Sequence, residues 1–192
     1  MPSNKTIIEV QGVKLALSNL NKVYYPLVNF TKEQVIDYYI RIAPVLLPHL
    51  AGRPLTLKRY PNGVTGNFFY QKQCPARPAW VTTTPVWSDR HRKYIDFCIV
   101  NDLPSLIWAA NLASLELHPS LSKAPAIETP TMVVFDLDPG PPATILDCVQ
   151  VAFWLRELFE NLELASFPKT SGSKGLQVYV PLNTPTDYTR TK

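Results

Sequence analysis

The sequence predicts an α+β fold in which mixed β-sheets are flanked by helices. Two segments, residues 31–48 and 144–162, repeat apolar residues at helical spacing, while shorter segments alternate or run apolar over strand lengths. The 192 residues include 19 prolines, many of which lie between apolar runs and end them. Strands and helices are mixed with hairpins, which favours mixed sheets. Because no interior linker is visible, we expect one domain over residues 1–192.

The first half of the chain is expected to be mainly strands around one helix. Residues 6–17 alternate in polarity and predict an opening strand or hairpin. Thr31-Lys32-Glu33-Gln34 is a capping-box pattern, which predicts a helix that ends near Pro48. Turn residues bound the further predicted strands, which cover residues 55–60, 67–73, 80–87 and 93–100.

The second half is expected to contain two helices and three strands. Residues 104–117 carry few charges and predict a buried helix. Met132–Leu137 is apolar enough for a central strand. An amphipathic helix follows over residues 144–162, and two last strands are expected over 165–169 and 176–181.

Bulk properties limit the class of protein without fixing its function. The net charge of +4 is too small by itself to demonstrate a nucleic-acid partner. No apolar run is long enough to span a bilayer, and the first residues lack a signal-peptide core, so we expect a cytoplasmic protein. Cys74, Cys98 and Cys148 show no C-x-x-C spacing, and we expect three reduced thiols.

The segment Phe135-Asp136-Leu137-Asp138-Pro139-Gly140 contains a candidate metal site. Residues two apart in a strand share a face, so Asp136 and Asp138 should project together while Phe135 and Leu137 enter the core. Two ionised carboxylates this close repel each other unless a cation neutralises them. Their hard oxygen ligands suit Mg²⁺ or Mn²⁺, which can serve phosphoryl or nucleotidyl transfer.

The acidic pair has other interpretations. Two solvated aspartates at a surface strand end would give the same pattern. Phosphatases with an aspartyl nucleophile also place D-x-D after an apolar strand, but Gly140 stands where they usually have Thr or Val. Metal-dependent sugar-nucleotide transferases use D-x-D as well, and nothing local excludes them.

Residues 169–176 form a second candidate site between two predicted strands. Small residues let the backbone approach a ligand, and successive amides can form an anion nest. Ser171, Ser173 and Lys174 add donors and a positive charge, which suits a triphosphate. The spacing is not that of a Walker loop, and a flexible hairpin turn is the simpler alternative.

Together these two segments resemble the polymerase domain of bacterial ATP-dependent DNA ligase D, which belongs to the archaeo-eukaryotic primase superfamily and serves non-homologous end joining. The resemblance implies a primase-like catalytic core. Further matching segments run in order along nearly the whole chain: Asn21-Lys22-Val23-Tyr24-Tyr25-Pro26, residues 46–50 and 53–59, Phe69-Tyr70-Gln71-Lys72 and Ser114-Leu115-Glu116-Leu117-His118.

The resemblance implies roles for individual residues. Asp136 and Asp138 are similar to catalytic, metal-binding aspartates that use Mn²⁺ or Mg²⁺. The resemblance also implies two protein partners, an end-joining ligase and an end-binding protein. Other positions match the family's sites for nucleoside triphosphates and for DNA ends with a recessed 5′-phosphate. The matching positions are Lys58, His118, Ser171, Lys174 and Gln177 for the nucleotide, Lys22 and Lys32 for the 5′-phosphate, and Phe69 and Tyr70 for stacking on template bases.

The chain departs from the family's pattern at two places. Gln177 stands where family members usually have a histidine, and an amide cannot carry charge. The family's third metal aspartate lies on a later strand, whereas the only later acid here is Asp187, in a Pro/Thr-rich tail. We therefore expect that the C-terminal part of the catalytic core is lacking. The sequence would then be either a piece of a longer protein or a naturally short or split member of the family.

Three functions are compatible with these features. The first is a DNA-repair primase-polymerase that adds nucleotides, with ribonucleotides preferred, to 3′ ends at breaks; as a short chain it should be weak or inactive. The second is a non-catalytic module that binds DNA ends by their 5′-phosphate. The third is a metal-dependent sugar-nucleotide transferase.

Overall fold

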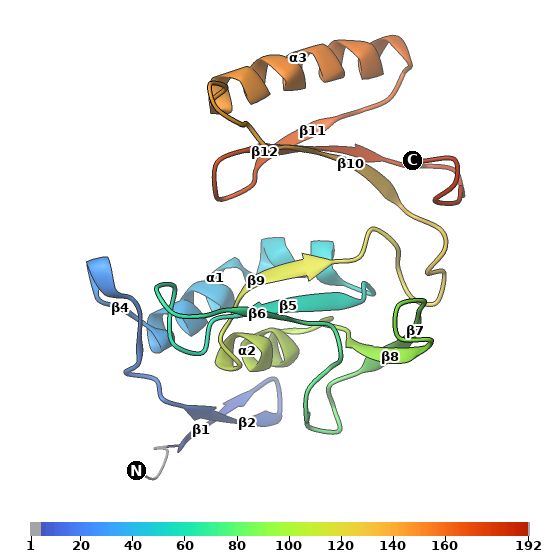
Figure 1. The fold of residues 1–192 in the computed structure, drawn as a ribbon. Helices are drawn as coiled ribbons and strands as arrows, with labels where there is room; N and C mark the ends of the chain where they lie inside the picture. Colours follow the sequence, from blue (N-terminus) through green and yellow to red (C-terminus); the bar gives the residue numbers. More distant parts are fainter. Residues whose placement is uncertain (1–4, 192) are drawn as a thin grey trace. The chain divides into compact units, whose positions relative to one another are not determined.

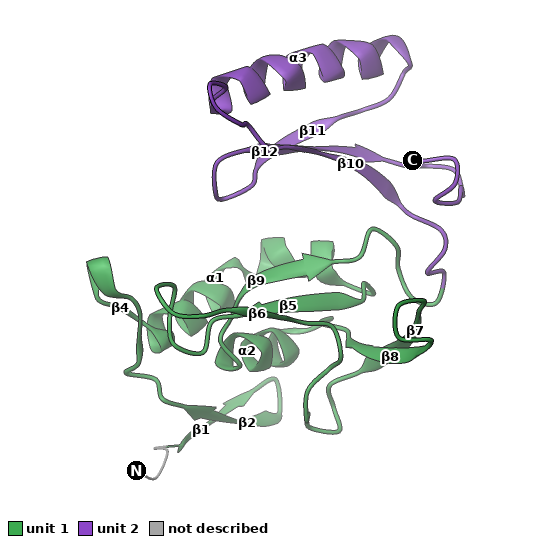
Figure 2. Cartoon of the chain, in the orientation of Figure 1, with its two compact units in different colours: residues 1–125 green, residues 126–192 purple. Residues whose placement is uncertain are grey.

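The computed structural model describes residues 5–191, which form two compact units (Figure 2). Unit 1 covers Met1–Pro125 and unit 2 covers Ala126–Lys192. Each unit has its own buried apolar cluster. The expected α+β class, with sheets flanked by helices, is confirmed, and the strand pairs of the described residues are antiparallel. The single domain over residues 1–192 stays a prediction.

The main sheet of unit 1 is organised around strand β5, Leu55–Arg59. Strand β5 pairs antiparallel with three strands, β6, β8 and β9 (Figure 1). Leu55 and Leu57 are almost completely buried, whereas Lys58 and Arg59 are half-buried. The strand therefore contributes side chains both to the core and to the accessible surface. The other strands of the sheet are β6 (Phe69–Gln71), β7 (Thr83–Ser88), β8 (Lys93–Cys98) and β9 (Ser114–Pro119).

Two helices pack in unit 1. The predicted capping box is present at the start of α1, Lys32–Leu50, where the Thr31 side chain accepts from the Gln34 amide. Helix α2, Leu103–Asn111, contributes the fully buried Leu106 and Ile107. The predicted opening hairpin is confirmed, and a short strand pair precedes α1; these elements are β1 (Lys5–Val10), β2 (Val13–Ser18), β3 (Val23–Tyr25), the 3₁₀ helix η1 (Pro26–Val28) and β4 (Phe30–Thr31).

The helix predicted over residues 104–117 is wrong in its second half. Helix α2 ends at Asn111, and Ala113 takes a left-handed conformation with φ of 66°. The chain then enters strand β9, which pairs with β5 over five positions. Leu115 and Leu117 alternate there with Glu116 and His118, a period of two that the apolar run before Ala113 obscured.

Unit 2 is a three-stranded antiparallel sheet with one helix on one face (Figure 1). The strand order is β10-β12-β11, so Met132–Leu137, predicted as central, is an edge strand among the described residues. The middle position belongs to β12, whose Val178 and Val180 are buried. The elements are β10 (Met132–Leu137), α3 (Ile145–Asn161), β11 (Phe167–Thr170) and β12 (Leu176–Pro181).

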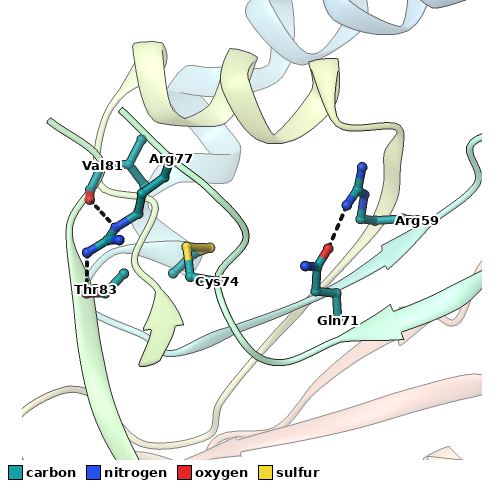
Figure 3. The surroundings of a disulfide bond; sticks show 7 residues. Arg59, Gln71, Cys74, Arg77, Val81 and Thr83 are labelled. Carbon is teal, nitrogen blue, oxygen red and sulfur yellow. Dashed lines mark hydrogen bonds between the residues drawn. A yellow bond between two sulfur atoms is a disulfide. The ribbon is translucent and has the colours of Figure 1, made fainter. Parts of the chain in front are cut away.

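Two of the three cysteines are not reduced thiols, contrary to expectation. Cys74 and Cys98 form a disulfide (Figure 3). Cys148 is free and buried. The Cys74 amide donates to the Asp96 carbonyl at 2.7 Å, which places Cys74 beside β8. The two half-cystines are 24 residues apart in sequence, a separation that carries no recognisable spacing signal.

Among residues 5–191, no helix is both long enough and apolar enough to cross a membrane.

The disulfide predicts a countable chemical outcome. Unfolded without reductant, the protein should expose one reactive thiol, Cys148, and after reduction three. Reduction should lower the free energy of unfolding by about 3 kcal/mol, because the cross-link no longer restricts the unfolded chain. Thiol titration with a chromogenic disulfide and urea denaturation measure both effects. Cys148→Ala is the control that keeps the cross-link, and three reactive thiols before reduction would contradict the assignment.

Candidate functional site

The acidic pair lies at the carboxyl end of β10. Asp136 is in the strand and Asp138 follows it, and both are exposed. Phe135 and Leu137 pack instead in the small core beneath α3, where the Phe135 and Phe159 ring centroids are 5.5 Å apart. The predicted alternation is therefore present, with the carboxylates outside and the apolar side chains inside.

Strand direction brings the second candidate segment to the same place. Strands β10 and β11 are both antiparallel to β12, so the end of β10 lies beside the β11–β12 turn of residues 171–175. A side chain at Gly175 would overlap the Leu137 carbonyl oxygen and would lie 3.0 Å from an Asp138 carboxylate oxygen. Only glycine allows this approach. The acidic pair and the Gly-Ser-Lys segment therefore form one cluster.

Ser171 organises the turn. Its hydroxyl donates to the Gly175 carbonyl at 2.9 Å and accepts from the Ser173 and Gly175 amides, each at 3.3 Å. Gly172 has φ of +87°, a conformation that favours glycine. Lys174 is exposed. The Ser173 and Gly175 amides thus already have the Ser171 hydroxyl as acceptor, and the anion nest stays a prediction.

Gln177 lies opposite Asp136 in the β10–β12 register and contacts it. Its side-chain amide donates to Asp136 Oδ1 at 3.2 Å, while the Tyr179 hydroxyl donates to Gln177 Oε1 at 2.9 Å. Burial raises the pKa of Tyr179, and the Asp136 charge adds to this. The Lys169 ammonium lies 5.8 Å from the Tyr179 ring centroid. Sequence reasoning missed Tyr179 and Lys169, although the alternation of β12 places Tyr179 on the face of Gln177.

The chemistry of the acidic pair fits a divalent cation. Two exposed carboxylates supply hard oxygen ligands, and the Gln177 amide would share the Asp136 carboxylate with a metal. Asp187 lies outside any strand, and its carboxylate accepts from the Arg190 amide at 3.0 Å. Over residues 5–191, no three His, Cys, Asp or Glu side chains gather closely enough to hold a metal.

In unit 1, Lys58 is held at the centre of a polar and aromatic cluster. Its ammonium lies 2.7 Å from Glu116 Oε1 and 4.4 Å from the Phe68 ring centroid. The Tyr60 and Tyr70 rings lie 5.4 Å and 5.5 Å away. Burial lowers the pKa of Lys58, but hydrogen bonds with Glu116 and Tyr60 outweigh it and leave the pKa raised.

Glu116 joins the two predicted nucleotide-site residues of this unit. Besides Lys58 it accepts a hydrogen bond from the Tyr60 hydroxyl, and its other oxygen lies 3.2 Å from His118 Nε2. Burial raises the pKa of Glu116, but these hydrogen bonds outweigh it and lower the pKa overall. Neither Glu116 nor Tyr60 was singled out from the sequence; Glu116 lies in β9, most of which was expected to be helical.

Phe69 and Tyr70, both predicted to stack on template bases, lie on opposite faces of β6. Tyr70 points into the Lys58 cluster, with its ring centroid 5.6 Å from that of His118. Phe69 lies on the other face, 5.3 Å from the Arg59 guanidinium carbon. The exposed fractions of 44% for Phe69 and 56% for Tyr70 show that neither is a core residue. Their stacking on DNA stays a prediction.

Lys22 and Lys32, predicted to bind a 5′-phosphate, lie together. The Lys32 amide donates to the Lys22 carbonyl at 2.8 Å. The Lys22 ammonium donates to Asn62 at 2.9 Å, and the Lys32 ammonium to the Ser18 carbonyl at 2.7 Å. Lys32 is only 3% exposed. Burial, followed by the charges of Lys22 and Arg59, lowers the pKa of Lys32 to about 8.

Known proteins are similar to this chain in both sequence and fold. The family model of the LigD primase-polymerase domain matches residues 31–192. The multifunctional non-homologous end joining protein LigD of Mycolicibacterium smegmatis is 41% identical over 90% of this chain. The multifunctional non-homologous end joining DNA repair protein LigD of Mycobacterium tuberculosis is 38% identical over 90% of it. The bifunctional LigD of Bacillus subtilis is 34% identical over 88% of it. The chain spans about a quarter of the length of these relatives, 23%, 24% and 27% respectively.

A solved structure agrees with the sequence matches. The polymerase domain of Mycobacterium tuberculosis ligase D, in complex with DNA, superposes with a TM-score of 0.84 at 37% identity, over 90% of this chain and 63% of that one. The fold and the acidic strand end thus define a protein of the primase-polymerase class. The chain belongs to the LigD primase-polymerase domain family. This membership disfavours the sugar-nucleotide transferase interpretation.

The lowered pKa of Lys32 predicts a pH-dependent stability. Between pH 8 and 10.5 the unfolded chain binds more protons at this lysine than the folded one, so stability should rise with pH in that window. Relative to Lys32→Met, the wild type should gain up to about 3 kcal/mol across it. Urea denaturation of both proteins at pH 7.5, 9 and 10.5 measures the difference, in which other titrations cancel. A constant difference would contradict the lowered pKa.

Proposed function

We propose that this chain is a primase-polymerase domain of DNA end joining that adds nucleotides, with ribonucleotides preferred, to 3′ ends at breaks. The observation that carries the proposal is the meeting of Asp136 and Asp138 with the turn of residues 171–175 at one end of the unit 2 sheet. Carboxylates for a metal and donors for phosphates are there within one cluster. Family membership supports the same activity, acting on DNA in the bacterial cytoplasm beside an end-joining ligase and an end-binding protein.

In this reaction a primer 3′-hydroxyl attacks the α-phosphorus of a nucleoside triphosphate, and pyrophosphate leaves. Bound Mn²⁺ or Mg²⁺ would neutralise the charge that develops on the attacking and leaving oxygens. Asp136 and Asp138 would hold it. Ser171 would donate to the phosphates once its hydroxyl turns from Gly175, and Lys174 would add a positive charge.

Low turnover is part of the proposal. Gln177 can donate to a phosphate but stays neutral, and one lost charge-assisted hydrogen bond costs on the order of 1–3 kcal/mol. Asp136 and Asp138 have no third carboxylate beside them in the part of the chain that the structure describes. Two carboxylates leave more of the metal's coordination to water and substrate, so we expect extension to be slow.

Recognition of DNA ends is a second function that a separate observation favours. After burial, the charges of Lys22 and Arg59 lower the pKa of Lys32, so both cations lie close to its ammonium. Lys32 is also the first residue of α1, where the positive end of the helix dipole favours anions. A phosphate would relieve this repulsion, so we propose that the site takes a recessed 5′-phosphate.

Primer extension tests the catalytic proposal. With Mn²⁺ and labelled ribonucleotides, we expect slow addition to a recessed primer by the wild type and at least a hundredfold loss in Asp136→Asn, because the metal loses a charged ligand. Asp187→Asn is the matched control and should extend like the wild type. Extension that survives in Asp136→Asn, or none by any protein at high concentration, would count against catalysis by this chain.

End binding is tested by comparing duplexes with recessed 5′-phosphate and 5′-hydroxyl ends in a fluorescence anisotropy titration. The phosphorylated end should bind about tenfold more tightly, since a charge-assisted contact contributes about 1.5–3 kcal/mol at most. Lys22→Ala should remove most of this preference. Lys14→Ala, which removes the same charge from an exposed position of β2, should keep it. Equal affinity for both ends would refute the 5′-phosphate site.

A further inference from the structure

Glu116 is a carboxylate between two residues that are proposed to bind a nucleotide. It is the common partner of Lys58, Tyr60 and His118. These contacts come from two strands, because Lys58 lies opposite Glu116 on β5, Tyr60 directly follows β5, and His118 stands two residues after Glu116 in β9. The side chain is 41% exposed, so the carboxylate is not required to fill the core.

The contacts of Lys58 fix an otherwise flexible side chain. A free lysine samples many rotamers, and ordering it on a ligand costs binding free energy. Here Glu116 anchors the ammonium at 2.7 Å, and the Phe68 ring lies 4.4 Å from it. The lysine side chain is only 14% exposed. Its ordering therefore precedes the arrival of any ligand.

The same carboxylate contacts the second predicted nucleotide-binding residue. Glu116 uses Oε1 for Lys58 and Oε2 for His118, so one side chain sets the separation of both. The Tyr70 ring packs edge-on to the His118 ring and limits its movement from the other side. Two groups that would meet a nucleotide are thus spaced by a third that need not touch it.

We propose that Glu116 is a positioning residue for nucleotide binding, whose carboxylate holds the Lys58 ammonium and the His118 ring in place for the incoming triphosphate. The inference rests on the proposed function, because it takes Lys58 and His118 as nucleotide-binding residues.

Electrostatics makes the proposal testable by sign. A carboxylate near a triphosphate repels it, so removing Glu116 should tighten binding if charge alone mattered. If Glu116 positions Lys58 and His118, its removal should weaken binding in spite of the more favourable charge. The direction in which Glu116→Ala changes the affinity therefore tells the loss of repulsion from the loss of positioning.

The experiment measures the affinity of the whole 192-residue protein for GTP with Mn²⁺ by isothermal titration calorimetry. We expect Glu116→Ala to weaken binding about tenfold, Glu116→Gln to weaken it less because the amide oxygen still accepts from Lys58, and Glu9→Ala to leave it unchanged or slightly tighter. Glu9 is an exposed carboxylate of the same unit, in β1. Thermal unfolding of each variant checks that the fold is kept.

A double-mutant cycle shows whether Glu116 acts through Lys58. The loss in Lys58→Ala with Glu116→Ala should be clearly smaller than the product of the two single losses, since the second change removes an interaction already broken. If the loss of affinity in the double variant equals the product of the two single losses, the proposal is overturned. Equal or tighter binding by Glu116→Ala would also overturn it.

A ligand-free measurement separates failure of this inference from failure of the proposed function. The Lys58 ε-methylene resonance, assigned by its loss in Lys58→Arg, should be shifted upfield by the Phe68 ring in the wild type and should return toward the random-coil position in Glu116→Ala. An unchanged resonance would overturn the role of Glu116 whether or not nucleotide binds. Absence of GTP binding by the wild type would overturn the proposed function and, with it, a nucleotide role for the cluster.

Discussion

The antiparallel register between β10 and β12 is the constraint on which the candidate metal site depends. It places Asp136 opposite Gln177 and Leu137 opposite Leu176, which sets the end of one strand against the start of the next. Because the two strands run in opposite directions, a turn that lies 33 residues or more after the aspartates returns beside them. A shift of one residue would turn the carboxylates toward α3 and Phe135 toward solvent.

The register also explains why the turn contains glycine where it does. Gly175 passes so close to the Leu137 carbonyl that no side chain fits, and this approach brings Asp138 to the turn. The small core beneath α3 holds the strands in this alignment through Cys148, Leu176 and Val178. Few buried residues thus determine the relation between the two candidate site segments of unit 2.

Most of the elements could be predicted from local patterns, because capping, alternation and turn residues act over a few positions. The capping box at Thr31, the opening hairpin and the apolar side of the D-x-D strand all follow from such rules. The edge position of β10 could not, since strand order depends on which segments pair across long separations. The disulfide was missed for the same reason, because 24 residues separate its cysteines.

The candidate site divides in the same way. Asp136, Ser171 and Lys174 stand in recognisable short motifs, so the sequence alone pointed to them. Glu116 gains its importance only from its cross-strand neighbour Lys58, and Tyr179 from its hydrogen bond to Gln177, which itself contacts Asp136 across the strands. A helix expected at residues 104–117 hid the alternation that would have placed Glu116 and His118 on one face.

The two lysine clusters of unit 1 differ in a way that bears on what each can bind. At Lys58 a carboxylate and a hydroxyl stabilise the ammonium, and the pKa is raised in spite of burial. At Lys32 burial and two neighbouring cations lower the pKa to about 8. An anion that reaches Lys32 therefore relieves an existing repulsion, whereas one that reaches Lys58 must compete with Glu116. The Lys32 arrangement is therefore the more favourable of the two for an added negative charge, whereas at Lys58 the proposed benefit of Glu116 is the fixed position of the ammonium.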